Sequence, residues 1–196
     1  MIPVAPVPEP ASFDETARRP GNAWVAEHPG ARRPRDYWSR FRGILADGFA
    51  NRCGYSAMHE PVGTVDHFRS IATDPQLTYE WTNYRFASPW LNSSKGSSEV
   101  LDPYEVGEGW FEVLLPSLQL VLTEKIPAEI RGRAEATLRR LPIEHDERIL
   151  KQRRRWYQHY LDGKLSFEGL SDNAPLIAAA VRKQLAEGDP RLREGT

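Results

Sequence analysis

The chain changes its hydrophobic periodicity along its length. Residues 109–115 and 118–123 are mostly apolar and flank a Pro-Ser pair, which is typical of two strands joined by a turn. In the C-terminal third, two sets of residues recur at helical spacing: Ile130, Ala134, Leu138 and Leu141, then Ile149, Arg153, Trp156 and Tyr160. A last apolar set between residues 176 and 185 predicts one more helix, separated from Phe167 and Leu170 by residues 171–175. Together these patterns predict an α+β fold.

The first half of the chain is less regular. Residues 1–12 are rich in proline, so we expect an extended arm that either packs on the body of the protein or stays unfolded. Apolar residues at helical spacing predict a helix over 36–50. Residues 52–69 contain glycines and a short β-branched piece, which favours a small hairpin. Serine capping predicts the start of a helix within residues 92–98.

The composition of the chain excludes several classes of protein. With 196 residues, 40% of them hydrophobic, the chain is long enough for one domain with a sizeable core. Its longest apolar stretch, at 174–181, is much shorter than the roughly 20 residues of a membrane-spanning helix. The N-terminus lacks the pattern of a secretory signal, and the single cysteine, Cys53, excludes an internal disulfide framework. We therefore expect a cytoplasmic protein with no membrane partner.

Positive charge is concentrated in one segment, although the net charge of the whole chain is only -1. Residues 131–155 carry nine basic and four acidic side chains. Such a segment can form a face that binds polyanions. The run Arg153, Arg154 and Arg155 is our candidate for contacts with nucleic acid, and a solvated helix face is the alternative.

Five polar residues in the middle of the chain have an informative spacing. Asp66 and His67 are adjacent, Asn83 follows after fifteen intervening residues, Asn92 after eight more and Lys95 after two more. Each residue type is common by itself. Together they contain a potential general base and several side chains with oxygen donors, residue types that metal-dependent hydrolysis uses.

This combination resembles the motif of the HNH endonucleases, most closely the small bacterial HNH proteins that serve in phage defence. The resemblance covers about residues 52–98 and extends plausibly to 123. It implies a ββα-metal core, accompanied here by an additional hairpin and enclosed by N- and C-terminal helices. The expected division is an extended arm at 1–20, the HNH-like core at 21–125, a C-terminal helical region of the same domain at 126–187 and a frayed tail at 188–196.

The resemblance also assigns roles to individual residues. His67 would be the general base that activates water, and Asp66 and Asn92 would bind one Mg²⁺ or Mn²⁺ ion. Asn83 would brace the loop that carries the base, and Lys95 would contact phosphate. Arg85 is a weaker candidate for a phosphate contact.

The chain departs from this family in its cysteines. Many relatives flank the motif with two Cys-x-x-Cys pairs that hold a structural zinc ion. The corresponding positions are Cys53 and Ser56 in the first pair, then Ser88 and Leu91 in the second. One thiol cannot hold zinc, so we expect no structural zinc and expect Tyr55, Trp90 and Leu91 to pack in its place.

These observations predict a metal-dependent endonuclease that hydrolyses phosphodiester bonds in DNA, with RNA as an alternative substrate of the same chemistry. The resemblance suggests a role in antiviral defence, a partner subunit such as an ATPase, and a possible homo-oligomer. The alternative is a catalytically inactive HNH-like scaffold that binds nucleic acid or a protein partner, a reading that the missing cysteines favour.

Overall fold

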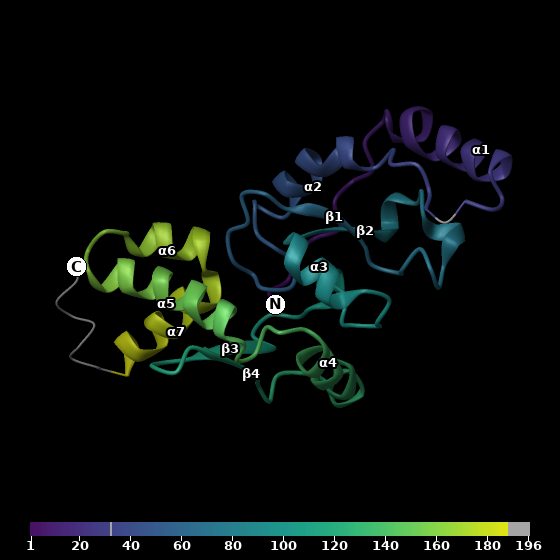
Figure 1. Ribbon diagram of the computed structural model, residues 1–196. Coiled ribbons are helices and arrows are strands. Elements are labelled where there is room, and N and C mark those ends of the chain that lie inside the picture. Colours follow the sequence, from purple (N-terminus) through teal and green to yellow (C-terminus); the bar gives the residue numbers. More distant parts are fainter. Residues whose placement is uncertain (32, 188–196) are drawn as a thin grey trace.

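A computed structural model describes residues 1–31 and 33–187 of the protein (Figure 1). The predicted frayed tail, 188–196, lies outside the described residues. The helices are α1 (Arg19–Glu27), α2 (Arg42–Gly48), α3 (Pro89–Lys95), α4 (Ala128–Arg140), α5 (Glu147–Leu161), α6 (Phe167–Asn173) and α7 (Pro175–Ala186). The strands are β1 (Thr64–His67), β2 (Tyr84–Ala87), β3 (Phe111–Leu114) and β4 (Gln119–Leu122). The α+β fold class is therefore confirmed.

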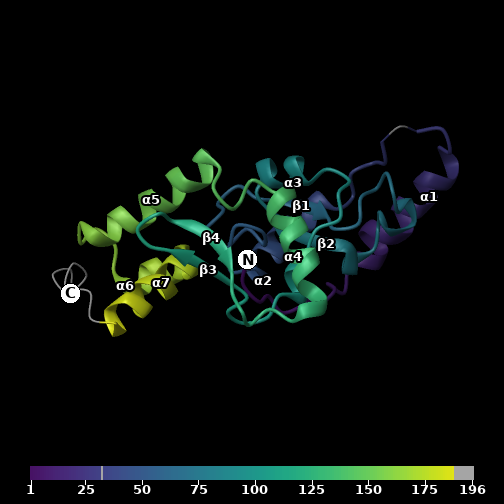
Figure 2. The same cartoon turned by 90° about the horizontal axis from the view of Figure 1, so that it is seen from below.

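The four strands form two separate antiparallel hairpins. In the first, His67 lies opposite Tyr84 and Val65 opposite Phe86. In the second, Phe111 lies opposite Leu122, as the sequence predicts. Two views show an elongated molecule, with α1 at one end, α5 to α7 at the other, and β3, β4 and α4 between them (Figures 1 and 2).

Each hairpin has its own hydrophobic cluster. Around the first hairpin, Val65 and Phe86 pack with Phe13 and Phe41 of the N-terminal region and with Trp81, which lies just before β2. Around the second, apolar residues of β3 and β4 pack with the C-terminal helices and with α3, which contributes Leu91. The helix α3 thus lies where the two parts of the core meet.

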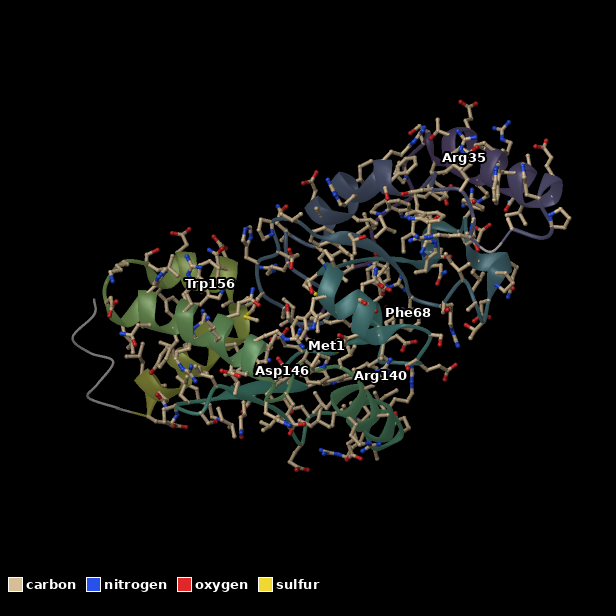
Figure 3. All side chains as sticks on the ribbon, viewed as in Figure 1. Met1, Arg35, Phe68, Arg140, Asp146 and Trp156 are labelled. Carbon is tan, nitrogen blue, oxygen red and sulfur yellow. The ribbon has the colours of Figure 1, made fainter. Side chains whose placement is uncertain are left out.

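The N-terminal arm packs on the body of the protein. Met1 is buried in the middle of the molecule (Figure 3), and Trp81 Nε1 donates a hydrogen bond of 2.7 Å to the carbonyl oxygen of Val7. The expected extended conformation holds only up to about residue 12. A turn of π-helix, Asp14–Arg18, leads directly into α1, so the prediction of an extended arm through residue 20 is wrong. The reason is tertiary: helix formation buries Phe13 and Ala17 in the aromatic cluster.

Two further predictions for the first half need correction. The helix expected over 36–50 is a short 3₁₀ turn, Ser39–Phe41, followed by α2, and it stops at Gly48 because Ala50 and Asn51 have positive φ angles. The hairpin expected within 52–69 is reduced there to one antiparallel bridge between Arg52 and His59, since β1 pairs with β2. Residues 53–58 instead form turns that bury Cys53, Tyr55 and Met58 in the core.

The remaining elements follow the sequence closely. The helix expected near residues 92–98 begins earlier, at Pro89, where the Ser88 hydroxyl accepts a hydrogen bond from the amide of Leu91. It ends at Lys95, and Gly96 follows with a positive φ angle. The helices α4, α5 and α7 confirm the predicted C-terminal helices, and α6 continues through Asn173 into the segment expected to separate them. No helix in the described ranges is long and apolar enough to cross a membrane.

Candidate active site

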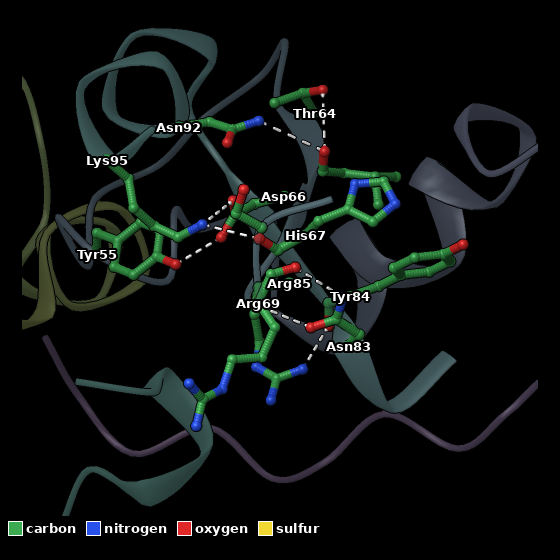
Figure 4. Close-up of polar contacts among 12 residues, drawn as sticks. Tyr55, Thr64, Asp66, His67, Arg69, Asn83, Tyr84, Arg85, Asn92 and Lys95 are labelled. Carbon is green, nitrogen blue, oxygen red and sulfur yellow. Dashed lines mark hydrogen bonds and ion pairs between the residues drawn. The ribbon is translucent and has the colours of Figure 1, made fainter. Parts of the chain in front are cut away.

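His67 lies at the end of β1, next to Asp66 and near Tyr84 (Figure 4), and three neighbouring groups contact its imidazole ring. Its Nε2 atom is 2.9 Å from the carbonyl oxygen of Thr78. The rings of Trp38 and Tyr84 contact it edge to face, with centroid distances of 4.6 Å and 5.0 Å. Since a carbonyl oxygen only accepts, Nε2 carries the proton of the neutral ring and Nδ1 keeps its lone pair.

The protein also favours the neutral form of this ring. Burial lowers the pKa of His67 below its ordinary value of 6.5, against the opposing effect of its hydrogen bond to Thr78. A neutral imidazole with an unprotonated Nδ1 is the form that a general base needs at neutral pH. Burial and the contacts with Thr78, Trp38 and Tyr84 thus favour a neutral imidazole in a fixed orientation.

Asn83 braces the loop that follows His67. Its Oδ1 atom accepts a hydrogen bond of 2.7 Å from the backbone amide of Arg69, and its Nδ2 atom donates to the carbonyl oxygens of Arg69 and Leu77. These contacts close the loop 69–77 at both ends. Thr78, whose carbonyl oxygen holds His67, comes directly after this loop, so Asn83 positions His67 indirectly.

Asp66, the residue before His67, is completely buried and takes part in an ion pair. Its Oδ1 atom is 2.8 Å from Lys95 Nζ, and its Oδ2 atom accepts a hydrogen bond from the hydroxyl of Tyr55. Lys95 Nζ also donates to the carbonyl oxygen of His67 over 2.8 Å. Lys95 is only 1% exposed, so its ammonium holds Asp66 and β1 in this structure, where the sequence predicted a contact with phosphate.

Asp66, His67, Asn92 and Lys95 all line one pocket of about 570 Å³. Asn92 is half-buried, and its Nδ2 atom lies 3.5 Å from the carbonyl oxygen of Val65. This placement leaves Asn92 Oδ1 without a hydrogen bond among the described residues. Of the predicted site residues, His67, Lys95, Asp66 and Asn92 therefore line one pocket, whereas Asn83 is not among its lining.

The donor set fits a hard divalent cation. A carboxylate oxygen has two lone pairs, so both oxygens of Asp66 keep acceptor capacity beyond their bonds to Lys95 and Tyr55. The ammonium of Lys95 already forms an ion pair with this carboxylate. Asp66 and Asn92 would be the protein ligands, and water and phosphate oxygens suit the other positions of an Mg²⁺ octahedron. No cluster of three or more His, Cys, Asp or Glu residues occurs within the ranges described.

Two of the arginines predicted to contact nucleic acid are buried. Arg85 forms a two-pronged ion pair with Asp102, donates to two carbonyl oxygens and lies over the ring of Tyr104. Arg153 is 1% exposed and donates to the carbonyl oxygens of Leu118, Ile143 and Glu144. Both therefore hold the fold together and are not placed to contact phosphate, which corrects the prediction.

Arg154 and Arg155, in contrast, are exposed on α5. Their surroundings are solvent, and no ion pair between either of them and an acidic side chain occurs among the described residues. They stay candidates for an electrostatic contact with a polyanion. Nothing in the geometry of α5 connects them with the pocket at His67.

The four positions that correspond to the zinc cysteines do come together. The Sγ atom of Cys53 accepts a hydrogen bond of 3.2 Å from the amide of Ser88. Ser56, Ser88 and Leu91 line one small pocket beside them. Tyr55 and Leu91 are buried as expected, whereas Trp90 is half-buried under the guanidinium of Arg148.

Several residues of the site were not anticipated from the sequence. Trp38 and Thr78 hold the imidazole of His67, and Tyr55 holds Asp66. Thr78 acts through its backbone oxygen, which no residue pattern reveals. Tyr55 lies between two of the positions that correspond to the zinc cysteines. The resemblance therefore predicted only that Tyr55 packs in place of the zinc ion, and it gave no reason to expect a hydrogen bond to Asp66.

Comparison of the chain with models of protein families, with curated proteins and with solved structures found no match.

The burial of the Asp66 ion pair predicts a large effect on stability. Lys95→Met leaves the carboxylate buried without its cation, and we expect it to lower the free energy of unfolding by about 3–5 kcal/mol. Tyr55→Phe removes one hydrogen bond to the same carboxylate and should cost about 1.5–3 kcal/mol. Urea unfolding of both variants, with the exposed Ser93→Ala on the same helix as control, measures these differences. A Lys95→Met variant as stable as the control would contradict the described pairing.

The lowered pKa of His67 predicts a pH dependence of stability. In the unfolded chain His67 takes up a proton near pH 6.5, and in the folded protein only at lower pH. The contribution of His67 to the free energy of unfolding is therefore fully present above pH 6.5 and is lost as the pH drops through the folded pKa. Urea unfolding at pH 7.5 and pH 5 should show a larger loss for the wild-type protein than for His67→Gln. Equal losses would mean that burial does not depress this pKa.

Proposed function

We propose that the protein is an HNH-type endonuclease that hydrolyses phosphodiester bonds in DNA, with His67 as the general base. One observation carries this proposal: His67, whose imidazole is held through Nε2, lines the same pocket as Asp66 and Asn92. The resemblance of the motif to the HNH family agrees with this arrangement. RNA offers the same phosphodiester bond, so it is a second substrate for the same site.

Several residues of the chain have separate roles in the proposed hydrolysis. His67 Nδ1 accepts a proton from a water molecule, and the resulting hydroxide attacks phosphorus in line with the leaving oxygen. The carbonyl oxygen of Thr78 accepts from Nε2 throughout, so the imidazolium that forms keeps its orientation. Asn83 holds the loop that presents Thr78. Asp66 and Asn92 would hold a Mg²⁺ or Mn²⁺ ion, which would supply positive charge for the phosphate and the leaving oxygen.

Lys95 acts as a positioning residue in this proposal. Its ammonium bonds to Asp66 and to the carbonyl oxygen of His67, so it fixes the metal ligand and the base relative to α3. Its charge also balances that of Asp66, which lets the carboxylate remain ionised although it is buried.

A second candidate function is the inactive scaffold, which binds nucleic acid or a protein partner. The specific observation in its favour is that Lys95 and Tyr55 together engage both oxygens of Asp66. In that case the ion pair is purely structural, and Arg154 and Arg155 would carry the contact with a polyanion. The resemblance also suggests an ATPase-type partner subunit, a homo-oligomer and a role in antiviral defence.

A cleavage assay separates the two functions. Supercoiled plasmid and circular single-stranded DNA are incubated with purified protein in Mg²⁺, in Mn²⁺ or in EDTA. We expect cleavage only with a divalent ion, and we expect His67→Ala to lose about 10²–10⁴-fold in rate because it removes the general base. His145→Ala, an exposed histidine outside the pocket, is the matched control and should keep full activity.

Two further results decide between the nuclease and the scaffold. Cleavage by His67→Ala at the wild-type rate would remove this site from consideration. If the wild-type protein cleaves neither DNA, calorimetric titration with Mn²⁺ decides: binding that disappears in Asp66→Asn supports a nuclease that requires a partner, and the absence of binding supports the scaffold.

A further inference from the structure

We propose that the pocket at His67 takes an unpaired nucleotide, so that single-stranded nucleic acid is the substrate of this site. This inference rests on the proposed function and adds the substrate class to it. The inference comes from a part of the pocket lining that lies outside the predicted catalytic residues. That part belongs to α1 and to the segment that follows it, and neither is part of the HNH-like motif.

The size of the pocket favours one nucleotide. At about 570 Å³ it lies within the usual range of pockets for small ligands, about 300–1,000 Å³. A base with its sugar and phosphate is a ligand of this class. Among the described residues, His28, Pro29 and Arg33 line this pocket together with Ser70, Ile71 and Pro75. A nucleotide that fills the pocket is unpaired, because its base lies against these residues and not against a partner base.

The far wall carries an aromatic stack. The rings of Trp24 and His28 lie nearly parallel, with a centroid distance of 4.4 Å and an interplanar angle of 12°, and both line the pocket. The Nδ1 atom of His28 lies 2.8 Å from the carbonyl oxygen of Trp24, so this ring is fixed in the stack. Fixed aromatic rings are the surfaces on which proteins stack unpaired bases without reading their sequence.

Trp24 has no evident role in the hydrophobic core. Of the six tryptophans in the chain, the other five belong to the two core clusters or pack against them, and Trp24 does neither. Its neighbours on the chain, Ala23 and Val25, are exposed. A large aromatic side chain that is half-buried at a pocket and absent from the core is suited to contact a ligand.

The charges that face the pocket suit a nucleotide as well. Asp66 is balanced by Lys95, which leaves Arg33 as the exposed cation of the lining. Arg33 lies on the same segment as His28, so a base on the aromatic stack would have a cation near its phosphate. Asp36 follows on the same segment and carries the opposite charge to Arg33. Its carboxylate accepts hydrogen bonds from the amide and the hydroxyl of Ser39.

The test compares strands of one sequence in different forms. Fluorescence anisotropy measures binding of labelled single-stranded DNA, single-stranded RNA and duplex DNA to the His67→Ala protein, which does not cleave in this account. We expect at least one single strand to bind 10-fold or more tightly than the duplex. Trp24→Ala in the same background should weaken that binding about 10-fold, while Trp24→Phe should retain most of it because a ring remains. Asn22→Ala, on the exposed side of α1, is the control.

The corresponding variants with His67 intact are then assayed for cleavage. A loss of kcat/KM on single strands in Trp24→Ala, with thermal unfolding unchanged, supports the proposal. Equal or tighter binding of duplex, or a Trp24→Ala variant that binds single strands like the control, overturns it. Both of those results are compatible with a nuclease that depends on His67. Loss of all His67-dependent cleavage, in contrast, would overturn the proposed function itself.

Discussion

The ion pair between Asp66 and Lys95 is the interaction on which the candidate site depends. It joins β1 to α3, two elements that are adjacent in space but separated by more than twenty residues of loop and strand. Both side chains are almost fully buried, so removal of either partner leaves a charge in a medium that solvates it poorly. The second bond of Lys95, to the carbonyl oxygen of His67, fixes the backbone of the base at the same time.

The hydrogen bonds of a single backbone carbonyl organise the other side of the site. The oxygen of Thr78 accepts from His67 Nε2 and from the hydroxyl of Tyr84. Thr78 is held in turn by the loop that Asn83 closes. The loop places the carbonyl oxygen of Thr78 beside Nε2 of the imidazole. Because a carbonyl oxygen only accepts hydrogen bonds, this contact fixes the tautomer with the proton on Nε2. The N-terminal region completes this side by packing Trp38 against the ring.

Parts of this arrangement follow from the sequence. Local patterns sufficed for the second hairpin and for three of the C-terminal helices, because hydrophobic periodicity and turn residues act over short distances. The resemblance placed Asp66, His67 and Asn92 in one site, and all three line one pocket. The pairing of β1 with β2 was missed, since residues 68–83 separate the strands and nothing local selects the partner. The arginines show a related limit. Arg85 and Arg153 were expected to contact phosphate, although Arg153 recurs with the apolar residues of its helix, and contacts with Asp102 and with backbone carbonyls bury them.

The central claim of this account is that His67 presents an unprotonated Nδ1 to the pocket while Nε2 holds Thr78. Long-range ¹H–¹⁵N NMR spectra of the folded protein report the protonation of each ring nitrogen directly. At pH 7.5, the account predicts the neutral Nε2–H tautomer for His67, assigned by its absence from the His67→Gln spectrum. A neutral Nδ1–H tautomer, or a doubly protonated ring at that pH, would contradict the role of His67 as the base.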